Sequence, residues 1–366
     1  MKRKVLTVAA IRPDLIRLAA LIKKLDHDPD IDHQFIMTGQ HYDDDRTTVF
    51  LRDLSIRAPD AILTSGADGR SHWEQVYECG RQMLDYLKTI PRPDLTLFLG
   101  DSNSVLAAIA LKKEGYRIGR VEALMRAYTN IQEMCVNGDC PLPEELNRTL
   151  TDKISDILFT YHEDYLKHAD RDGIPLDRVH VVGNTIVEPV KSIMDPARVN
   201  IKSHIILDIH RHDNIEDRSR LWFIIKCANR YSEIFNTPVK MLSFGRTISA
   251  IQKHNIDVSK INIVPLMGYR DFIASQQDAL FSISDSGSAM EELPLLGVPC
   301  IVPRRTTERP QSTLNNNSTL LQMDEESFEK SVRWLDSWSV AHSKTEWLGS
   351  GNTSQRIVDE VKRFLA

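Results

Sequence analysis

The chain has 366 residues, more than one compact core usually holds, and this length favours about two domains. Charged residues make up 27% and apolar residues 42%, a globular composition that excludes a disordered or fibrous chain. The formal net charge of −5 gives no reason to expect a nucleic acid as partner, so any phosphate group would be bound by a local cluster.

Short apolar runs alternate with helical patterns over the first half of the chain. The apolar runs predict buried strands at residues 5–10, 34–38, 95–99, 118–121, 157–160 and 179–182. The segments between them predict helices at residues 13–25, 46–54, 72–88, 103–113, 144–155 and 163–169. Repeated strand–helix units of this kind indicate a parallel sheet covered by helices on both faces.

A polar break at Met194-Asp195-Pro196 interrupts this pattern, and the alternation then restarts. We expect strands at residues 205–209, 239–242, 261–264, 280–283 and 299–302, and helices at 220–234, 271–276 and 290–295. The predicted fold is therefore α/β, with two doubly wound Rossmann-like domains facing across a cleft. The expected domains are residues 1–193 and 194–352, and an amphipathic helix within 353–366 is expected to pack back on the first domain.

Polar side chains directly follow the expected strands in both halves. In open α/β sheets, ligands bind beyond the carboxyl ends of the strands. The residues at these positions are Arg12, Gln40, His41, Asp101, Glu122, His210 and Ser286. We therefore expect them to border one binding site.

The segment from Ser284 to Glu292 carries the strongest local signal. Ser286, Gly287 and Ser288 form a turn between an apolar run and a helical pattern. The start of a helix presents N–H groups without intrahelical partners and the positive end of the helix dipole, which favours phosphate binding. Glu292, one turn into the helix, is placed to accept hydrogen bonds from a ribose. The segment thus predicts a nucleotide site.

The five cysteines are an odd, scattered set, which is typical of reduced thiols in a cytoplasmic protein. Cys135 and Cys140 share a loop, but no C-x-x-C motif or neighbouring histidine pair accompanies them, so we expect no metal site. The residues after Met1 form a strand pattern rather than the apolar core of a signal peptide, and no stretch is long enough to cross a bilayer. We expect no membrane association.

Taken together, these turns resemble the UDP-N-acetylglucosamine 2-epimerase family over nearly the whole chain. The matching pieces fall in the family's order, which argues against chance. They are Arg12-Pro13-Asp14, Thr38-Gly39-Gln40-His41, Gly100-Asp101, Val121-Glu122-Ala123, Pro143-Glu144-Glu145-Leu146-Asn147-Arg148, Gly183-Asn184-Thr185, His210-Arg211, Ser284-Asp285-Ser286-Gly287, Glu291-Glu292 and Thr307-Glu308-Arg309-Pro310.

The resemblance implies a glycosyltransferase-B-like fold and inversion of C2 of a UDP-linked acetamido sugar, without a cofactor. UDP would be eliminated across C1–C2 and added back to the other face of the glycal. Asp101, Glu122 and Glu144 would be the acid/base carboxylates, whose individual roles stay open, and His210 would support the departing diphosphate. Substrate contacts would come from Arg12, Arg17, Gln40, His41, Arg126, Arg148, Arg211, Phe272, Ser286, Gly287, Ser288, Glu292 and Arg309. Phe272 fits core packing as well as a contact with uracil. A homodimer is also implied.

Several departures from the family pattern surround the sugar. Arg17 stands where the family has lysine, and Leu124 and Ser288 replace glycines. Three stretches are similar to a branch that acts on UDP-linked diacetamido uronic acids or 6-deoxy acetamido sugars: Gly39-Gln40-His41-Tyr42-Asp43, Gly100-Asp101-Ser102-Asn103-Ser104 and Gly268-Tyr269-Arg270-Asp271-Phe272. A substrate carboxylate would need an extra cation, which Arg17, Arg126 or His212 could supply.

Three alternatives remain beside the epimerase hypothesis. A glycosyltransferase of the same fold would bind the same nucleotide without needing three opposed carboxylates. A catalytically silent UDP-sugar-binding protein would fit the lost glycines. A hydrolysing epimerase would release free sugar and UDP.

Overall fold

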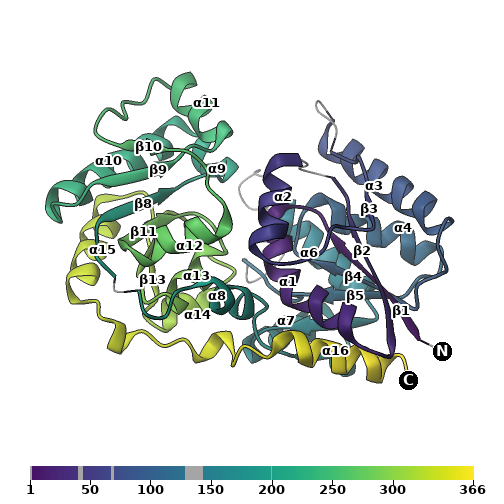
Figure 1. Ribbon diagram of the computed structural model, residues 1–366. Coiled ribbons are helices and arrows are strands. Elements are labelled where there is room, and N and C mark those ends of the chain that lie inside the picture. Colours follow the sequence, from purple (N-terminus) through teal and green to yellow (C-terminus); the bar gives the residue numbers. More distant parts are fainter. Residues whose placement is uncertain (1, 40–43, 67–69, 128–142, 199) are drawn as a thin grey trace. The chain divides into compact units, whose positions relative to one another are not determined.

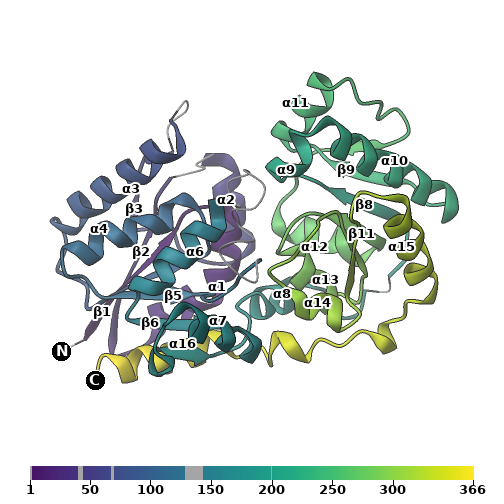
Figure 2. The ribbon, with the colours of Figure 1, turned by 180° about the vertical axis from the view of Figure 1, so that it is seen from behind.

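A computed structural model describes residues 2–39, 44–66, 70–127, 143–198 and 200–366. The chain divides into two compact units (Figure 1 and, from behind, Figure 2). Unit 1 comprises Met1–Pro189 and Leu348–Ala366, and unit 2 comprises Val190–Trp347.

Unit 1 is built on a parallel sheet whose described strands lie in the order β3-β2-β1-β4-β5-β6-β7. Their bounds are β1 Arg3–Ala9, β2 Ile31–Met37, β3 Ala61–Ile62, β4 Leu95–Leu99, β5 Ile118–Val121, β6 Ile157–Thr160 and β7 Val179–Val181. The strand order reverses between β1 and β4, which pair directly. This is the doubly wound pattern, and the reversal marks the place where such sheets bind ligands.

The helices of unit 1 cover the two faces of this sheet (Figures 1 and 2). They are α1 Arg12–His27, α2 Asp44–Asp53, α3 His72–Leu87, α4 Ala107–Lys113, α6 Pro143–Ile154, α7 Leu166–Asp172, α8 Val187–Ile193, which runs into unit 2, and α16 Thr353–Phe364. Short 3₁₀ turns are η1 Asn103–Leu106, η2 Glu163–Tyr165 and η3 Leu176–Arg178. At the start of α3, Ser71 and Glu74 bond each other's backbone N–H groups, a capping box. Helix α16 packs against α1.

Unit 2 repeats the doubly wound pattern with the strand order β10-β9-β8-β11-β12-β13. The strands are β8 His204–Asp208, β9 Val239–Leu242, β10 Asn262–Val264, β11 Ala279–Ser284, β12 Cys300–Val302 and β13 Ser318–Leu320. The helices are α9 His212–Ile215, α10 Arg218–Ile234, α11 Gly245–Lys253, α12 Tyr269–Gln277, α13 Ala289–Leu295, α14 Pro310–Leu314 and α15 Glu325–Ser337, with 3₁₀ turns η4 Val340–His342 and η5 Glu346–Leu348. Here the order reverses between β8 and β11.

The expectation of two doubly wound parallel sheets is confirmed, although some elements of unit 2 were not expected from the sequence. Helices α11 and α15 and strand β13 are the main additions. Helix α15 carries a start signal, because the Asp324 carboxylate accepts a hydrogen bond from the Ser327 N–H (2.7 Å). Phe328 of this helix is fully buried in the unit 2 core, and the partly buried Val332, Trp334 and Leu335 pack against the same core, so tertiary contacts stabilise the helix.

The described residues can also be assessed for membrane-spanning helices, metal-binding clusters and free cysteines. None of their helices combines the length and the apolar character needed to cross a lipid bilayer. In the same residues, no cluster of His, Cys, Asp and Glu could hold a metal ion. Cys79, Cys227 and Cys300 are buried free thiols, whereas Cys135 and Cys140 lie outside the described ranges.

Candidate active site

Predicted acid/base residues of unit 1 lie at the carboxyl ends of neighbouring strands. Asp101 follows β4 and Glu122 follows β5, while Asp14 lies in the first turn of α1, just after β1. Since β1, β4 and β5 are adjacent and parallel, these three residues share the edge of the sheet where the strand order reverses.

Asp14 is a buried carboxyl near two of the predicted acid/base residues, Asp101 and Glu122. Its Oδ2 accepts hydrogen bonds from the backbone N–H groups of Ala10 (2.8 Å) and Ile11 (3.1 Å). Burial raises the pKa of Asp14; the two backbone bonds oppose this effect, and repulsion from Asp101 and Glu122 adds to it, so that the pKa is about 7. Asp14 therefore changes its charge near neutral pH.

Glu122 is buried and held by two donors. Its Oε1 accepts hydrogen bonds from the Arg17 guanidinium and from the Thr185 hydroxyl (2.7 Å). The backbone of Glu122 is left-handed, with a φ of 59°. Left-handed non-glycine residues are costly and occur mainly where the surrounding structure fixes them, often at functional sites.

Asp101 is held from helix α6. Arg148 forms ion pairs with Asp101 and with Glu145 (3.1 Å), and the Asn147 amide donates to the Asp101 backbone carbonyl (2.8 Å). Burial raises the pKa of Glu145, and the attraction of Arg148 opposes the shift. Glu144, in the first turn of the same helix, has one carboxylate oxygen, Oε2, that is buried without a hydrogen-bond partner among the described residues.

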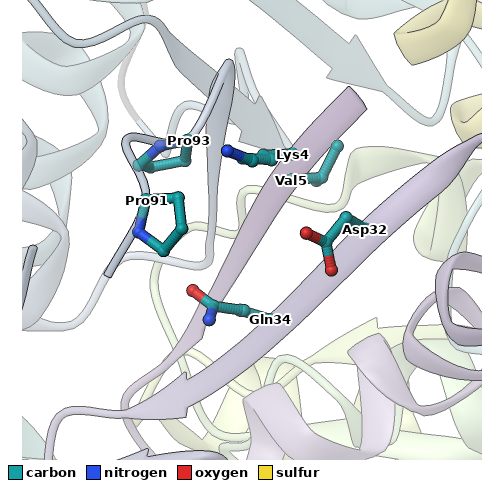
Figure 3. A pocket seen from close by; sticks show the side chains of 6 residues that line it. All are labelled: Lys4, Val5, Asp32, Gln34, Pro91 and Pro93. Atoms are coloured by element: carbon teal, nitrogen blue, oxygen red, sulfur yellow. The ribbon is translucent and has the colours of Figure 1, made fainter. Parts of the chain in front are cut away.

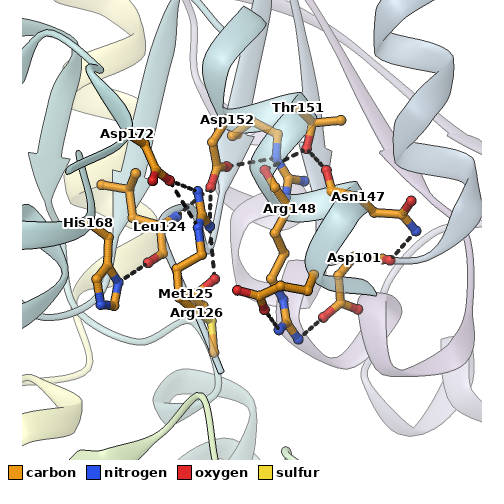
Figure 4. A network of polar contacts seen from close by, with 12 residues as sticks. Asp101, Leu124, Met125, Arg126, Asn147, Arg148, Thr151, Asp152, His168 and Asp172 are labelled. Atoms are coloured by element: carbon orange, nitrogen blue, oxygen red, sulfur yellow. Dashed lines mark hydrogen bonds and ion pairs between the residues drawn. The ribbon is translucent and has the colours of Figure 1, made fainter. Parts of the chain in front are cut away.

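Behind these turns, Arg126 belongs to a buried ion-pair network (Figure 4). Its guanidinium donates to Asp152 (2.8 Å) and to Asp172 (2.8 and 3.1 Å), and the residue is only 4% exposed. Asp152 also accepts the backbone N–H of Leu124 (2.9 Å). These ion pairs thus engage the Arg126 guanidinium inside the protein. The expected contact between Arg126 and the substrate stays a prediction.

In unit 2, His210 lies beside two buried carboxylates at the corresponding reversal point. Its Nδ1 is 3.1 Å from Asp208 Oδ1 and 3.6 Å from Asp285 Oδ1. Asp285 also accepts the backbone N–H groups of His210 (3.1 Å) and Arg211 (3.1 Å). Burial lowers the pKa of His210, but attraction to Asp285 and Asp208 outweighs it and raises the pKa to about 9. The imidazole is therefore a cation at neutral pH.

The Ser-Gly turn before α13 is packed against an arginine. A Cβ added to Gly287 would lie 2.2 Å from Arg309 Nη1, so glycine is needed for this close approach. Arg309 pairs in turn with Glu291 (2.8 Å) and Glu308 (2.5 Å), and all three residues are buried. Gly287 thus lets the cluster of Arg309, Glu291 and Glu308 sit directly under the turn.

Other predicted contact residues of unit 2 lie around this turn. Glu292 is buried and accepts a hydrogen bond from the Tyr269 hydroxyl (2.9 Å). Phe272, on α12, is half-buried. Ser286 and Ser288 are half-buried as well.

In unit 1 the structure brings together Asp101, Glu122, Arg17 and Arg148, with Glu144 on the helix that holds Asp101. Arg12 is half-buried at the start of α1, and Gln40 and His41 lie outside the described residues.

Sequence reasoning missed several residues that hold these groups. Asp14, Thr185 and Asp285 all lie in the matching motifs, yet no role was expected of them. The usable signal was their place in turns that follow strands. Asp208 and Asp152 lie outside the matching motifs, at the end of β8 and in the last turn of α6, and no role was expected of them.

A small cavity lies at the other end of the unit 1 strands (Figure 3). It holds about 10 Å³, room for roughly one water molecule. Its lining is Lys4, Val5, Asp32, Gln34, Pro91 and Pro93, near the amino ends of β1 and β2. This cavity is therefore separate from the carboxylate edge.

Comparisons with known proteins show the family to which the chain belongs. The model of the family described as UDP-N-acetylglucosamine 2-epimerase matches residues 23–362. A UDP-N-acetylglucosamine 2-epimerase of Methanococcus maripaludis is 29% identical over 98% of both chains. A UDP-2,3-diacetamido-2,3-dideoxy-D-glucuronate 2-epimerase of Pseudomonas aeruginosa is 25% identical over 99% of this chain and 100% of its own.

Solved structures of known proteins are also similar to this chain. The crystal structure of Methanocaldococcus jannaschii UDP-GlcNAc 2-epimerase in complex with UDP-GlcNAc and UDP is 27% identical, with a TM-score of 0.87 over 98% of this chain and 99% of that one. A kitacinnamycin glycotransferase, at 11% identity and a TM-score of 0.64 over the whole of both chains, shows the fold alone. The glycosyltransferase-B-like fold expected from the sequence is confirmed. The chain belongs to the UDP-N-acetylglucosamine 2-epimerase family, a family of isomerases.

Proposed function

We propose that this protein inverts C2 of a UDP-linked acetamido sugar: the C2 proton and UDP are eliminated to give a glycal, and UDP is then added back to C1 while a proton is delivered to the other face of C2. The observation that carries the proposal is the position of Asp101 and Glu122 after neighbouring strands, at the reversal point of the unit 1 sheet. Each of the two carboxylates is held by its own arginine. A base must remove the weakly acidic C2 proton on one face of the sugar, and an acid must deliver a proton on the other.

The surroundings of the carboxylates support this chemistry. Arg17 and Thr185 hold Glu122, and Arg148 holds Asp101, so each carboxylate has a fixed orientation. Asp14 lies close enough to repel both of them. Carboxylates whose environments differ are the usual means of dividing acid and base roles. We assign the proton transfers to Asp101, Glu122 and Glu144 as a group.

His210 is proposed to stabilise the diphosphate as it leaves. Departure of UDP from C1 develops negative charge on the phosphate oxygens, and a fixed cation lowers the energy of that state. Asp208 and Asp285 keep the imidazole protonated.

We propose UDP-N-acetylglucosamine as the first substrate to test, because the epimerases of M. maripaludis and M. jannaschii are named for it. A UDP-linked diacetamido uronic acid is the second, because the P. aeruginosa relative is named for one. Arg17 and Arg126 are engaged by protein carboxylates, which leaves the exposed His212 as the expected cation for a substrate carboxylate.

We also propose a homodimer formed through the outer face of α3, α4 and α6. Large apolar side chains are highly exposed on these helices, and α4 packs against both α3 and α6. They are Trp73 (73%), Tyr77 (58%), Leu146 (47%), Ile109 (39%) and Leu150 (38%). Exposed apolar side chains grouped on one face mark protein interfaces.

The test of the function is hydrogen exchange at C2 of a UDP-sugar in deuterated water. Deuterium at C2 in intact UDP-sugar supports the proposal. Free UDP and free sugar would instead indicate hydrolysis. UDP binding without exchange on UDP-N-acetylglucosamine and on its diacetamido and 6-deoxy analogues would favour a glycosyltransferase or a silent binding protein.

A further inference from the structure

Asp152, in the last turn of α6, contacts the turn that carries Glu122. It is fully buried, and its Oδ2 accepts the backbone N–H of Leu124 (2.9 Å) and the Arg126 guanidinium (2.8 Å). Figure 4 shows these bonds converging on one carboxylate. Asp152 is therefore anchored on a helix and bonded to a loop.

The turn that Asp152 holds is conformationally costly. Glu122 and Leu124 both have left-handed backbones, with φ of 59° and 67°. A leucine rarely adopts this conformation, so neighbouring bonds must fix it. The Leu124 N–H bonds Asp152, and the Leu124 carbonyl bonds His168 Nδ1 (2.7 Å). The direction of the Glu122 side chain depends on this turn.

A second connection runs from Asp152 to the turn that carries Asp101. Asp152 Oδ1 pairs with Arg120 Nε at 3.4 Å. Arg120 is completely buried, and its Nη2 donates to the Gly100 carbonyl (2.6 Å), one residue before Asp101. A planar guanidinium can make both contacts at once.

We propose that Asp152 is a positioning residue that fixes the turns of Asp101 and Glu122 relative to each other, through Arg120 on one side and the Leu124 N–H on the other. The inference rests on the proposed function, because it treats these two carboxylates as the groups that handle the C2 proton. Misplacement of a reacting group by about 1 Å costs on the order of 100-fold in rate. A positioning residue affects the rate through the placement of the reacting groups, without touching the substrate itself.

The first test is Asp152→Asn, measured as C2 exchange and UDP binding. We expect kcat to fall on the order of 10- to 100-fold, while KM and the Kd for UDP stay within about twofold. Asp172→Asn is the matched control, because it removes an ion pair with the same Arg126 but no bond to Leu124 or Arg120. An unchanged kcat in Asp152→Asn, or an equal loss in Asp172→Asn, overturns the proposal.

The second test separates positioning from general stability. Leu124→Gly permits the left-handed backbone without strain, whereas Leu124→Ala removes the same side chain and keeps the strain. We expect Asp152→Asn to lower kcat less in the Leu124→Gly background than in the Leu124→Ala background. Equal losses in the two backgrounds contradict the proposal.

Two further measurements apply if the Asp152→Asn variant does not fold or if the wild-type protein is inactive. If Asp152→Asn does not fold, Arg120→Lys keeps a charge beside Asp152 but loses the fork to Gly100, and an unchanged kcat there overturns the proposal. If the wild type exchanges no UDP-sugar, the proposed function fails. The amide resonance of Leu124 in ¹⁵N-leucine-labelled protein then tests the bond itself. We expect it to shift in Asp152→Asn and to stay in place in Asp172→Asn; no shift contradicts the assignment.

Discussion

Arg17 donates a hydrogen bond to Glu122 across more than one hundred positions of sequence, and the two side chains are only 4% and 6% exposed. A buried ion pair orients both partners, and removal of one partner leaves the other as an uncompensated charge. The pair therefore fixes the direction of the carboxylate that we assign to proton transfer.

Glu122→Gln should abolish most C2 exchange while sparing UDP affinity. Glutamine keeps the shape and an acceptor for Arg17 and Thr185, but it cannot take up a proton from C2. General acid–base catalysis contributes roughly 100- to 10,000-fold, so a loss in this range is expected. Exchange by NMR and UDP binding by calorimetry check the two parts. Exchange at the wild-type rate would remove Glu122 from the mechanism.

Asp14→Asn should change the pH dependence of stability. The folded protein keeps the Asp14 proton up to a pKa of about 7, whereas the unfolded chain releases it near 3.8. The wild type therefore loses free energy of unfolding as pH rises from about 4 to about 7. The variant lacks this loss, so its Tm relative to the wild type should increase across that window. A Tm difference that is constant with pH would contradict the burial argument.

His210 should give the reaction an alkaline limit. Its pKa is raised to about 9, so the cation and its stabilising ion pairs are complete below about 6.5 and are lost as pH rises through about 9. We expect kcat/KM to fall through the same range. Asp208→Asn should move that limb to lower pH, because it removes one of the two carboxylates beside the imidazole. Asp213→Asn is the control, because Asp213 forms ion pairs with Arg211 and Arg220. An alkaline limb that does not move in Asp208→Asn argues against the pair.

Gly287→Ala should destabilise unit 2 and weaken UDP binding. The new Cβ would overlap Arg309, and displacement of its guanidinium would disrupt the buried ion pairs with Glu291 and Glu308. Overpacking of this kind costs about 1–3 kcal/mol. Gly245→Ala, at the start of α11, is the matched control, because its added Cβ meets nothing within 4 Å among the described atoms. Chemical denaturation of both variants measures the difference, and equal stability would contradict the packing argument.

Trp73→Glu combined with Tyr77→Glu should yield a monomer. Charges in the centre of an apolar interface oppose association. Light scattering measures the mass in solution. Trp222→Glu, an exposed tryptophan (48%) on α10 of unit 2, should leave the mass unchanged. A wild-type monomer, or a double variant that remains dimeric, would contradict the proposed surface.

The sequence was sufficient for the order of strands and helices and for the turns that carry Asp101, Glu122 and His210. Buried parallel strands appear as short apolar runs, and functional residues follow them. It was insufficient for α11, whose nine residues include only three buried ones, Thr247, Ala250 and Ile251. Its nine residues are also fewer than the roughly 11 to 18 over which helical periodicity is usually recognised.

The sequence also did not indicate which residues of the site contact each other. The motifs identify Arg17 and Glu122 separately, but only the pairing of β1 with β4 and of β4 with β5 brings their turns together. Leu124 illustrates the same limit. A leucine gives no indication of a left-handed backbone, and the bonds that hold it come from α6 and His168. Asp14 appears in sequence as an ordinary first-turn carboxylate, and its repulsion by Asp101 follows from strand order.

The most direct test of the account is ¹H NMR of UDP-N-acetylglucosamine incubated with the wild-type protein in deuterated water. We predict that the C2 proton signal is lost while the UDP linkage stays intact, and that UDP-linked N-acetylmannosamine appears. If that substrate is inert, the same result is expected with the diacetamido or the 6-deoxy analogue. Retention of the C2 proton on all three, with UDP bound, would contradict the central claim.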